Sequence, residues 1–212
     1  MKLPKFTSIE LLACFVLGIL MAYFFAIPTA ISLYTAVFHV IALSTIFYFY
    51  KQKRLKPFWY TVFSFLSILF INSITTRLNS ERETALITLA IIHNAENYEG
   101  TQYKYGGTTK KGMDCSGLIR TIFKEENIAL PRASSAMAQT GEWIAIEEVK
   151  AGDLLFFRTR SNTSRVNHVG LVTCTENDAI EFIHSTTSQG VITSKLSEKY
   201  WYFAFVQARR VL

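Results

Sequence analysis

Charged residues are scarce in this chain of 212 residues, since Asp, Glu, Lys and Arg make up only 18% of it, against about 25% in a typical soluble domain. Half of the residues are hydrophobic, and this composition excludes an intrinsically disordered chain. Cysteine is rare as well. The three cysteines lie at scattered positions, which excludes a disulfide framework.

The net charge of +6 is distributed unevenly along the chain. Residues 1–83 carry eight basic and three acidic residues, which leaves 14 basic and 13 acidic residues in 84–212. The excess therefore flanks apolar segments, where it indicates membrane topology rather than a nucleic-acid-binding surface. We expect no nucleic-acid partner.

Long uncharged runs dominate the first third of the sequence. No Asp, Glu, Lys or Arg occurs from Leu11 to Tyr50, a stretch long enough for two crossings at about 20 residues each. Pro28 supplies the break between them because proline disrupts a helix. The sequence therefore predicts a membrane anchor over residues 1–79, with three transmembrane helices near residues 9–27, 30–50 and 58–74.

Basic residues predict the orientation of this anchor. Lys2 and Lys5 precede the first predicted helix, and four further basic residues lie between the second and the third. Under the positive-inside rule both groups belong in the cytoplasm, so the chain after the third helix lies outside. The lipoprotein-like run Leu11–Cys14 is not interpreted as a lipid anchor, because no apolar segment precedes it.

Residues 80–212 alternate between polar and apolar segments in a way that predicts a folded α+β domain. Helical periodicity comes first and strand-like periodicity follows, which is typical of helices packed on an antiparallel sheet. Ser80 and Glu83 have the spacing of a capping box that starts a helix. The predicted helices cover residues 80–97, 115–126 and 134–140, and the predicted strands cover 153–158, 166–174, 179–185, 190–193 and 202–209.

Cys115 begins the second of these helices, directly after a glycine-rich loop. A thiol at a helix N-terminus experiences the positive end of the helix dipole, which favours the reactive thiolate. Leu118 and Ile122 share its helix face, so the sulfur is expected at the seam between helix and sheet. These features suit a nucleophile, although an isolated cysteine in such a place is also a common packing residue.

Two histidines lie on neighbouring predicted strands. His168 and His184 are centred on residue 176, inside the predicted turn, so a symmetric hairpin places them directly opposite each other on one face. One imidazole would then accept the thiol proton while the other orients it. The alternative is two unrelated strand histidines. Cys174 lies along the same strand and is interpreted as a core or strand-end thiol.

Six segments in order resemble the NlpC-type cell-wall peptidases, which are compact papain-like cysteine hydrolases. The resemblance covers residues 103–184 and leaves out the predicted membrane half. Tyr105 stands where this family commonly has tryptophan. The matching segments are Tyr103-Lys104-Tyr105-Gly106-Gly107, Asp114-Cys115-Ser116-Gly117-Leu118, Leu130-Pro131-Arg132, Gly152-Asp153-Leu154, Asn167-His168-Val169-Gly170 and Phe182-Ile183-His184.

The resemblance implies a role for several residues. It makes Cys115 the nucleophile, His168 the general base and His184 the polar residue that orients the base. It also places Tyr103 in the lining of the site, where it would help the oxyanion or the substrate. No metal or organic cofactor is implied, and the roles of Ser116 and Arg132 are left open between structure and substrate contact.

The sequence thus predicts a membrane-anchored cysteine peptidase on the outer side of a bacterial cytoplasmic membrane. By resemblance, its substrates are amide bonds in peptidoglycan stem peptides, often between D-γ-glutamate and a diamino acid. The expected partners are these peptides and the lipid bilayer, and a regulatory partner in the membrane is left open. The alternatives are an amidase or lipid acyltransferase on a related fold, and a non-catalytic wall-binding or signalling protein.

Overall fold

The computed structural model describes residues 57–159, 165–176 and 179–212. The chain divides into two compact units, residues 1–80 and 81–212. The transmembrane helices predicted over residues 9–27 and 30–50 lie outside the described residues. Within the described ranges, no helix is both long enough and apolar enough to cross a membrane.

The first described element is α3, a helix of 40 residues from Pro57 to Glu96. The sequence predicted two helices here, over 58–74 and 80–97, with a short link between them. The predicted break is wrong, because the helix continues through Ser80, which therefore caps nothing. No proline or glycine occurs between Pro57 and Gly100, so nothing in the backbone chemistry forces a break.

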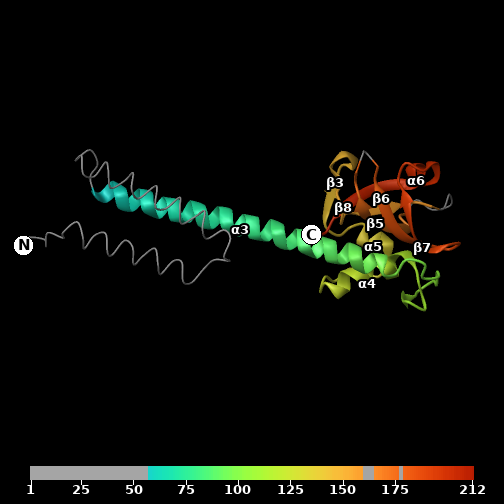
Figure 1. Ribbon diagram of the computed structural model, residues 1–212. Helices are drawn as coiled ribbons and strands as arrows, with labels where there is room; N and C mark the ends of the chain where they lie inside the picture. The colour runs from blue at the N-terminus through green and yellow to red at the C-terminus, as the bar shows by residue number, and fades with distance from the viewer. Residues whose placement is uncertain (1–56, 160–164, 177–178) are drawn as a thin grey trace, which may run out of the picture. The chain divides into compact units, whose positions relative to one another are not determined.

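A six-stranded antiparallel sheet forms the centre of the second unit (Figure 1). Its strand order is β3-β8-β4-β5-β6-β7, so four consecutive strands, β4 to β7, stand side by side. The predicted α+β class with an antiparallel sheet is confirmed. The strands are β3 (Glu142–Ile144), β4 (Leu154–Phe157), β5 (His168–Cys174), β6 (Glu181–Thr186), β7 (Gly190–Lys195) and β8 (Phe205–Arg210).

Three helices after α3 and a small hairpin complete the unit. The helices are α4 (Cys115–Glu125), α5 (Ser134–Met137) and α6 (Lys199–Ala204). The hairpin pairs β1 (Thr108–Thr109) with β2 (Gly112–Met113), and a 3₁₀ turn spans Ile146–Glu148. The sequence pattern predicts none of β3, the hairpin and α6. It predicts a strand from residue 202, whereas that strand begins only at Phe205.

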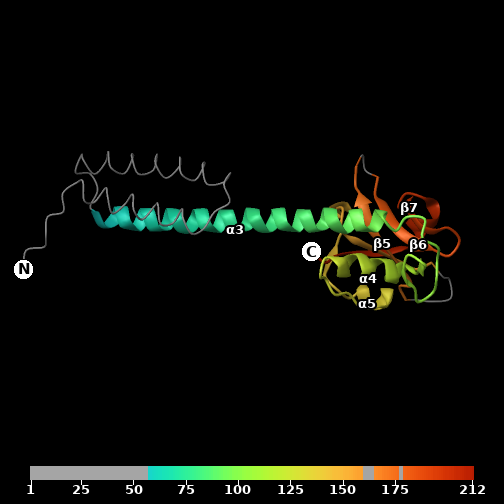
Figure 2. The same cartoon turned by 60° about the horizontal axis from the view of Figure 1, so that its bottom comes forward.

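The sheet has a separate hydrophobic core on each face because side chains alternate along a strand. On one face, buried residues of α4 and of the C-terminal part of α3 pack against Val169, Leu171 and Ile183. Figure 2 shows α4 and α5 together on one side of the sheet. On the other face, Trp201 and Ala204 of α6 pack against the intervening strand residues. The strand β5 therefore contributes alternate residues to both cores.

Candidate active site

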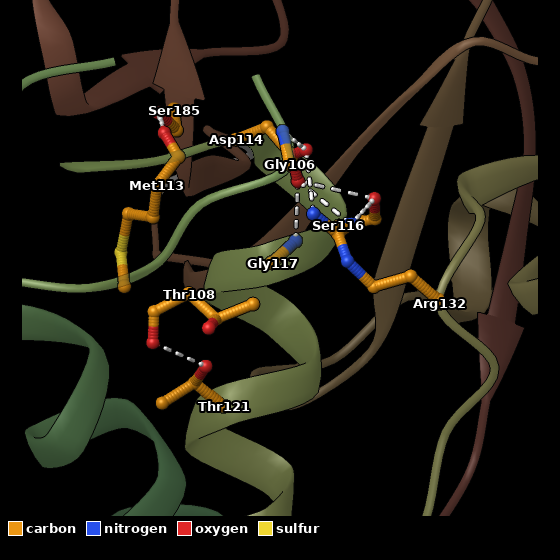
Figure 3. A network of polar contacts seen from close by, with 9 residues as sticks. All are labelled: Gly106, Thr108, Met113, Asp114, Ser116, Gly117, Thr121, Arg132 and Ser185. Carbon is orange, nitrogen blue, oxygen red and sulfur yellow. Dashed lines mark hydrogen bonds and ion pairs between the residues drawn. The ribbon is translucent and has the colours of Figure 1, made fainter. Parts of the chain in front are cut away.

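The N-terminus of α4 is fixed by the carboxylate of Asp114. Its Oδ1 accepts a hydrogen bond of 2.7 Å from the Gly117 N–H, and its Oδ2 accepts one of 2.7 Å from the Gly106 N–H (Figure 3). Gly117 also permits a close approach, since a Cβ there would lie 2.1 Å from the Gly107 carbonyl oxygen. The glycine loop and the helix start are thereby held together.

Arg132 forms a two-pronged ion pair with the same carboxylate. Its Nη1 and Nη2 donate to Oδ1 and Oδ2 of Asp114 at 2.9 and 2.7 Å, and Nη1 also donates to Ser116 Oγ at 2.8 Å (Figure 3). Burial alone would raise the pKa of Asp114, but the hydrogen bonds from Arg132 and from Gly117 and Gly106 outweigh it and lower the pKa. The structure therefore places Arg132 and Ser116 in a network that supports the helix start.

Cys115 is the first residue of α4, and it is buried, with only 8% of the residue exposed. Burial raises the pKa of this thiol, and the charge of Asp114 adds to the rise, while a hydrogen bond from the backbone of Val169 opposes it. The net direction is opposite to the thiolate-favouring shift that the helix start alone predicted. Desolvation outweighs the helix dipole here because the sulfur is almost fully enclosed.

His168 and His184 lie on one face of β5 and β6, as predicted, but in a different register. Leu171 pairs with Ile183, a shift of two residues from the symmetric hairpin, and the register changes again between Val172 and Cys174. An even shift keeps each side chain on its predicted face. The two histidines are therefore diagonal rather than direct neighbours, a distance that large side chains can bridge.

The two imidazoles are hydrogen-bonded to each other and then to a serine. His168 Nε2 lies 3.0 Å from His184 Nδ1, and His184 Nε2 lies 3.0 Å from Ser194 Oγ. All three side chains are buried. Gly170 makes room for this row, because a Cβ there would lie 3.2 Å from the Cβ of His184 and 2.5 Å from the ring of Phe182.

An aromatic enclosure surrounds the histidine pair. Trp201 of α6 stacks on His168 with ring centres 5.3 Å apart and meets His184 edge-on at 4.5 Å. Phe182 stacks on His184, and Phe157 also contacts His168. Burial lowers the pKa of His168 to about 4 and, with the neighbouring His168, that of His184 to about 3. Both imidazoles are therefore neutral at physiological pH.

A single pocket of about 500 Å³ brings Cys115 and His168 together with Tyr103. His184 is not among the described residues that line the pocket; it lies behind His168, to which it is hydrogen-bonded. The rest of this lining is dominated by hydroxyl and amide side chains, and Glu198 is its one charged residue. Within the described part of the chain, no three His, Cys, Asp or Glu side chains gather as metal ligands.

Cys174 takes no part in this pocket. Among the described cysteines, both Cys115 and Cys174 are free thiols, and Cys174 stands at the register change near the end of β5, paired with Glu181. Its position agrees with the interpretation as a strand-end residue.

Sequence reasoning missed Ser194 and Trp201. Ser194 had a usable signal, because residues 187–190 resemble a turn and symmetric pairing around residue 188 places Ile192 opposite His184. This pairing is observed, and Ser194 then follows two residues later on the same face. Trp201 had no such signal, since no motif connects it to the histidines and its helix was not predicted.

A thiol at a helix start beside an imidazole on an antiparallel sheet is the arrangement of a papain-like cysteine hydrolase. The NlpC/P60 family profile matches residues 100–210, more than half of the chain. The chain belongs to the NlpC/P60 family, a family of cysteine peptidases.

Relatives and solved structures agree with this membership. The chain is 39% identical over 140 residues to the probable endopeptidase NlpC homolog of Haemophilus influenzae, covering 64% of this chain and 70% of the relative. It is 37% identical over 123 residues to the murein DD-endopeptidase MepS/murein LD-carboxypeptidase of Escherichia coli K12, covering 58% of this chain and 62% of the relative.

Among solved structures, an NlpC/P60 family protein from Bacillus cereus superposes with a TM-score of 0.54 and is 28% identical. The match covers 59% of this chain and 40% of the other, so the chain spans less than half of that protein.

Proposed function

We propose that this protein is a membrane-anchored cysteine peptidase that hydrolyses amide bonds in peptidoglycan stem peptides. The observation that carries the proposal is the pocket shared by Cys115 and His168, with His184 hydrogen-bonded behind the imidazole. Membership of the NlpC/P60 family supports the substrate class.

The chemistry assigned to the site is an acyl transfer in two halves. The Cys115 sulfur attacks the amide carbonyl and its proton passes to His168. When the C–N bond breaks, His168 returns that proton to the leaving amine. A water molecule, deprotonated by His168, then hydrolyses the thioester and regenerates the thiol.

The electrostatics of the site indicate when the proton moves. The raised pKa of Cys115 and the lowered pKa of His168 make the neutral thiol and neutral imidazole the resting pair. Proton transfer is then coupled to attack on the carbonyl rather than completed beforehand. Tyr103, which lines the same pocket, is assigned to contact with the substrate carbonyl or the peptide beside it.

The proposed bond is the one between D-γ-glutamate and the diamino acid of the stem peptide. The name of the Escherichia coli relative specifies a DD-endopeptidase, which would cut a cross-link between two stems instead. Defined muropeptides of both kinds, incubated with the full chain and weighed by mass spectrometry, separate the two specificities because the fragments differ in mass.

The decisive control is a pair of cysteine variants. Cys115→Ala should abolish cleavage, a loss on the order of 10³-fold or more, whereas Cys174→Ala should leave the rate unchanged. Absence of any cleavage by the natural chain, or equal cleavage by Cys115→Ala, would contradict the proposal.

The membrane anchor over residues 1–79 is part of the same proposal. Its support is the two uncharged runs, Leu11–Tyr50 and Pro57–Thr76, with basic residues before the first run and between the two. Three crossings with those basic residues in the cytoplasm orient residues 80–212 toward the cell wall. Carbonate washing of membranes should leave the chain in the pellet. Protease added to intact spheroplasts should degrade the catalytic domain, and its full protection would refute the orientation.

A further inference from the structure

His168, His184 and Ser194 form a hydrogen-bonded row that ends at Ser194, a residue of β7 that is 7% exposed. Its Oγ lies 3.0 Å from His184 Nε2, while His184 Nδ1 lies 3.0 Å from His168 Nε2. Each ring nitrogen of the fully buried His184 is thus within hydrogen-bond distance of a side chain, His168 on one side and Ser194 on the other. Ser194 also lines the pocket, so its own hydroxyl proton has room to point away from His184.

The direction of the hydrogen bonds in this row follows from the chemistry. Because His168 Nε2 is engaged with His184, Nδ1 is the nitrogen left to accept the thiol proton. In the neutral ring, Nδ1 must then be bare and Nε2 must carry the hydrogen. That N–H then donates to His184 Nδ1, so the proton of His184 sits on Nε2 and needs an acceptor. Ser194 Oγ is the acceptor at hydrogen-bond distance.

The opposite direction would disable the base. If the Ser194 hydroxyl donated to His184 Nε2, then His184 Nδ1–H would donate to His168 Nε2. The proton of neutral His168 would then sit on Nδ1, where it could not accept one from Cys115. The protonated form of His168 also donates from Nε2, so one orientation of His184 serves both halves of the reaction.

We propose that Ser194 is a positioning residue that accepts the Nε2–H of His184 and thereby holds His168 in the tautomer that can deprotonate Cys115. The proposal rests on the proposed function for its catalytic consequence. The tautomer itself is a separate physical property and can be measured without substrate.

The surroundings of His184 explain why a hydroxyl suits this place. The described groups that face the ring are His168 from β5, Phe182 from β6, Ser194 from β7 and Trp201 from α6, and none of them carries a permanent charge. A carboxylate at position 194 would attract a proton into the row and favour imidazolium. An uncharged acceptor fixes the direction in which the hydrogen bonds of the row are donated, and it leaves both imidazoles neutral.

Nitrogen-15 NMR of the full chain tests the tautomer directly. The sequence contains four histidines, and single variants of His39, His93 and His184 assign their signals. In the natural chain, His184 should be an Nε2–H tautomer and His168 should also be an Nε2–H tautomer. Ser194→Ala should give a mixture at both rings, whereas Ser194→Thr, which keeps a hydroxyl, should restore the single form.

A matched control is Thr193→Ala, one residue earlier on the same strand and exposed, which should change neither tautomer. In muropeptide cleavage, Ser194→Ala should lower kcat about fivefold, and Ser194→Thr should recover most of the loss. An Nδ1–H tautomer at His184 in the natural chain, or unchanged tautomers in Ser194→Ala, would overturn the proposal. Failure of the natural chain to cleave muropeptides would refute the proposed function alone.

Discussion

The two faces of the central sheet build the two halves of the site by different means. On the α4 face, the thiol is held by charge and backbone: the Asp114 carboxylate, its Arg132 partner and the N–H groups at the helix start. On the α6 face, the histidines are held by an uncharged row and an aromatic enclosure formed around Trp201.

The difference follows from what each half must do. A nucleophile needs a fixed position, and a carboxylate with several donors provides rigid, directional support. A general base needs a fixed tautomer, and its surroundings must not raise its pKa so far that it stays permanently protonated. Aromatic rings and a hydroxyl supply those conditions, whereas an ion pair close to the imidazoles would not.

The sharpest test of the uncharged half is the removal of His184. His184→Ala leaves the His168 Nε2–H without its partner in a buried site, so kcat should fall on the order of 10²-fold. His184→Asn retains a side-chain oxygen that can accept the same hydrogen bond and should recover part of the loss. Steady-state cleavage of muropeptides measures both, and equal rates for His184→Ala and the natural chain would remove His184 from the catalytic row.

Trp201 tests the enclosure itself. Trp201→Ala removes a large side chain that is 8% exposed, and the free energy of unfolding should fall by about 3 kcal/mol. Water admitted beside His168 should also return its pKa from about 4 toward its ordinary value of 6.5. Urea unfolding measures the first effect. The pH at which the cleavage rate falls on the acid side measures the second effect. If that pH is the same in Trp201→Ala and the natural chain, another group excludes water from His168.

Arg132 tests the charged half. Arg132→Met leaves the Asp114 carboxylate unpaired, and the free energy of unfolding should fall by about 2 kcal/mol, below the range for fully buried pairs because Arg132 is partly exposed. The uncompensated charge should also raise the pKa of the Cys115 thiol further. Peptide-resolved mass spectrometry of iodoacetamide labelling across pH measures that rise.

A second ion pair in the same unit provides the matched control. Arg210 donates to Asp153 through Nε and Nη2 at 2.8 and 2.7 Å, so this pair is also two-pronged. It differs from the pair at Asp114 in the nitrogens used, which there are Nη1 and Nη2. Arg210→Met should therefore lower stability comparably while leaving the labelling profile of Cys115 unchanged. Identical labelling profiles for both arginine variants would contradict a local electrostatic role for Arg132.

The smallest expected effect is the response of the natural enzyme to mild acid. Because burial lowers the pKa of His168 to about 4 and that of His184 to about 3, kcat should change less than about twofold between pH 5 and 7. An acid limb centred near 6.5 would contradict the enclosure. Stability should respond below pH 6.5: the unfolded chain binds more protons than the folded chain between pH 6.5 and 4, so the free energy of unfolding falls as the pH drops through that range.

Local pattern predicted most of the elements that carry the site. The apolar face of α4, the continuous apolar run of β4 and the strand patterns of β5 and β6 are short-range signals, and these elements appear within a few residues of the expected bounds. The shared face of His168 and His184 was also predictable, because a two-residue slip preserves the side on which a strand residue points.

Features that depend on long-range packing were not predictable. The capping box at Ser80 is a valid start signal, yet α3 runs through it because nothing in the chain ends the preceding helix. The hairpin register differs by two residues because the strand pairing is irregular near Cys174. The α6 helix has few local signals of its own, and Trp201 and Ala204 are buried only through contact with the sheet.

The order of chemical groups along the chain determined which atoms could react: a thiol after a glycine loop, and two imidazoles on strands that share a face. Tertiary structure decided the protonation of those groups, since desolvation acts through every neighbour that excludes water and no sequence pattern reports it. It raised the pKa of Cys115 where the helix start alone favoured thiolate, and it placed Trp201 against the histidines although no motif connects them. Proton affinity is a property of the surrounding volume, whereas residue identity and spacing are properties of the chain.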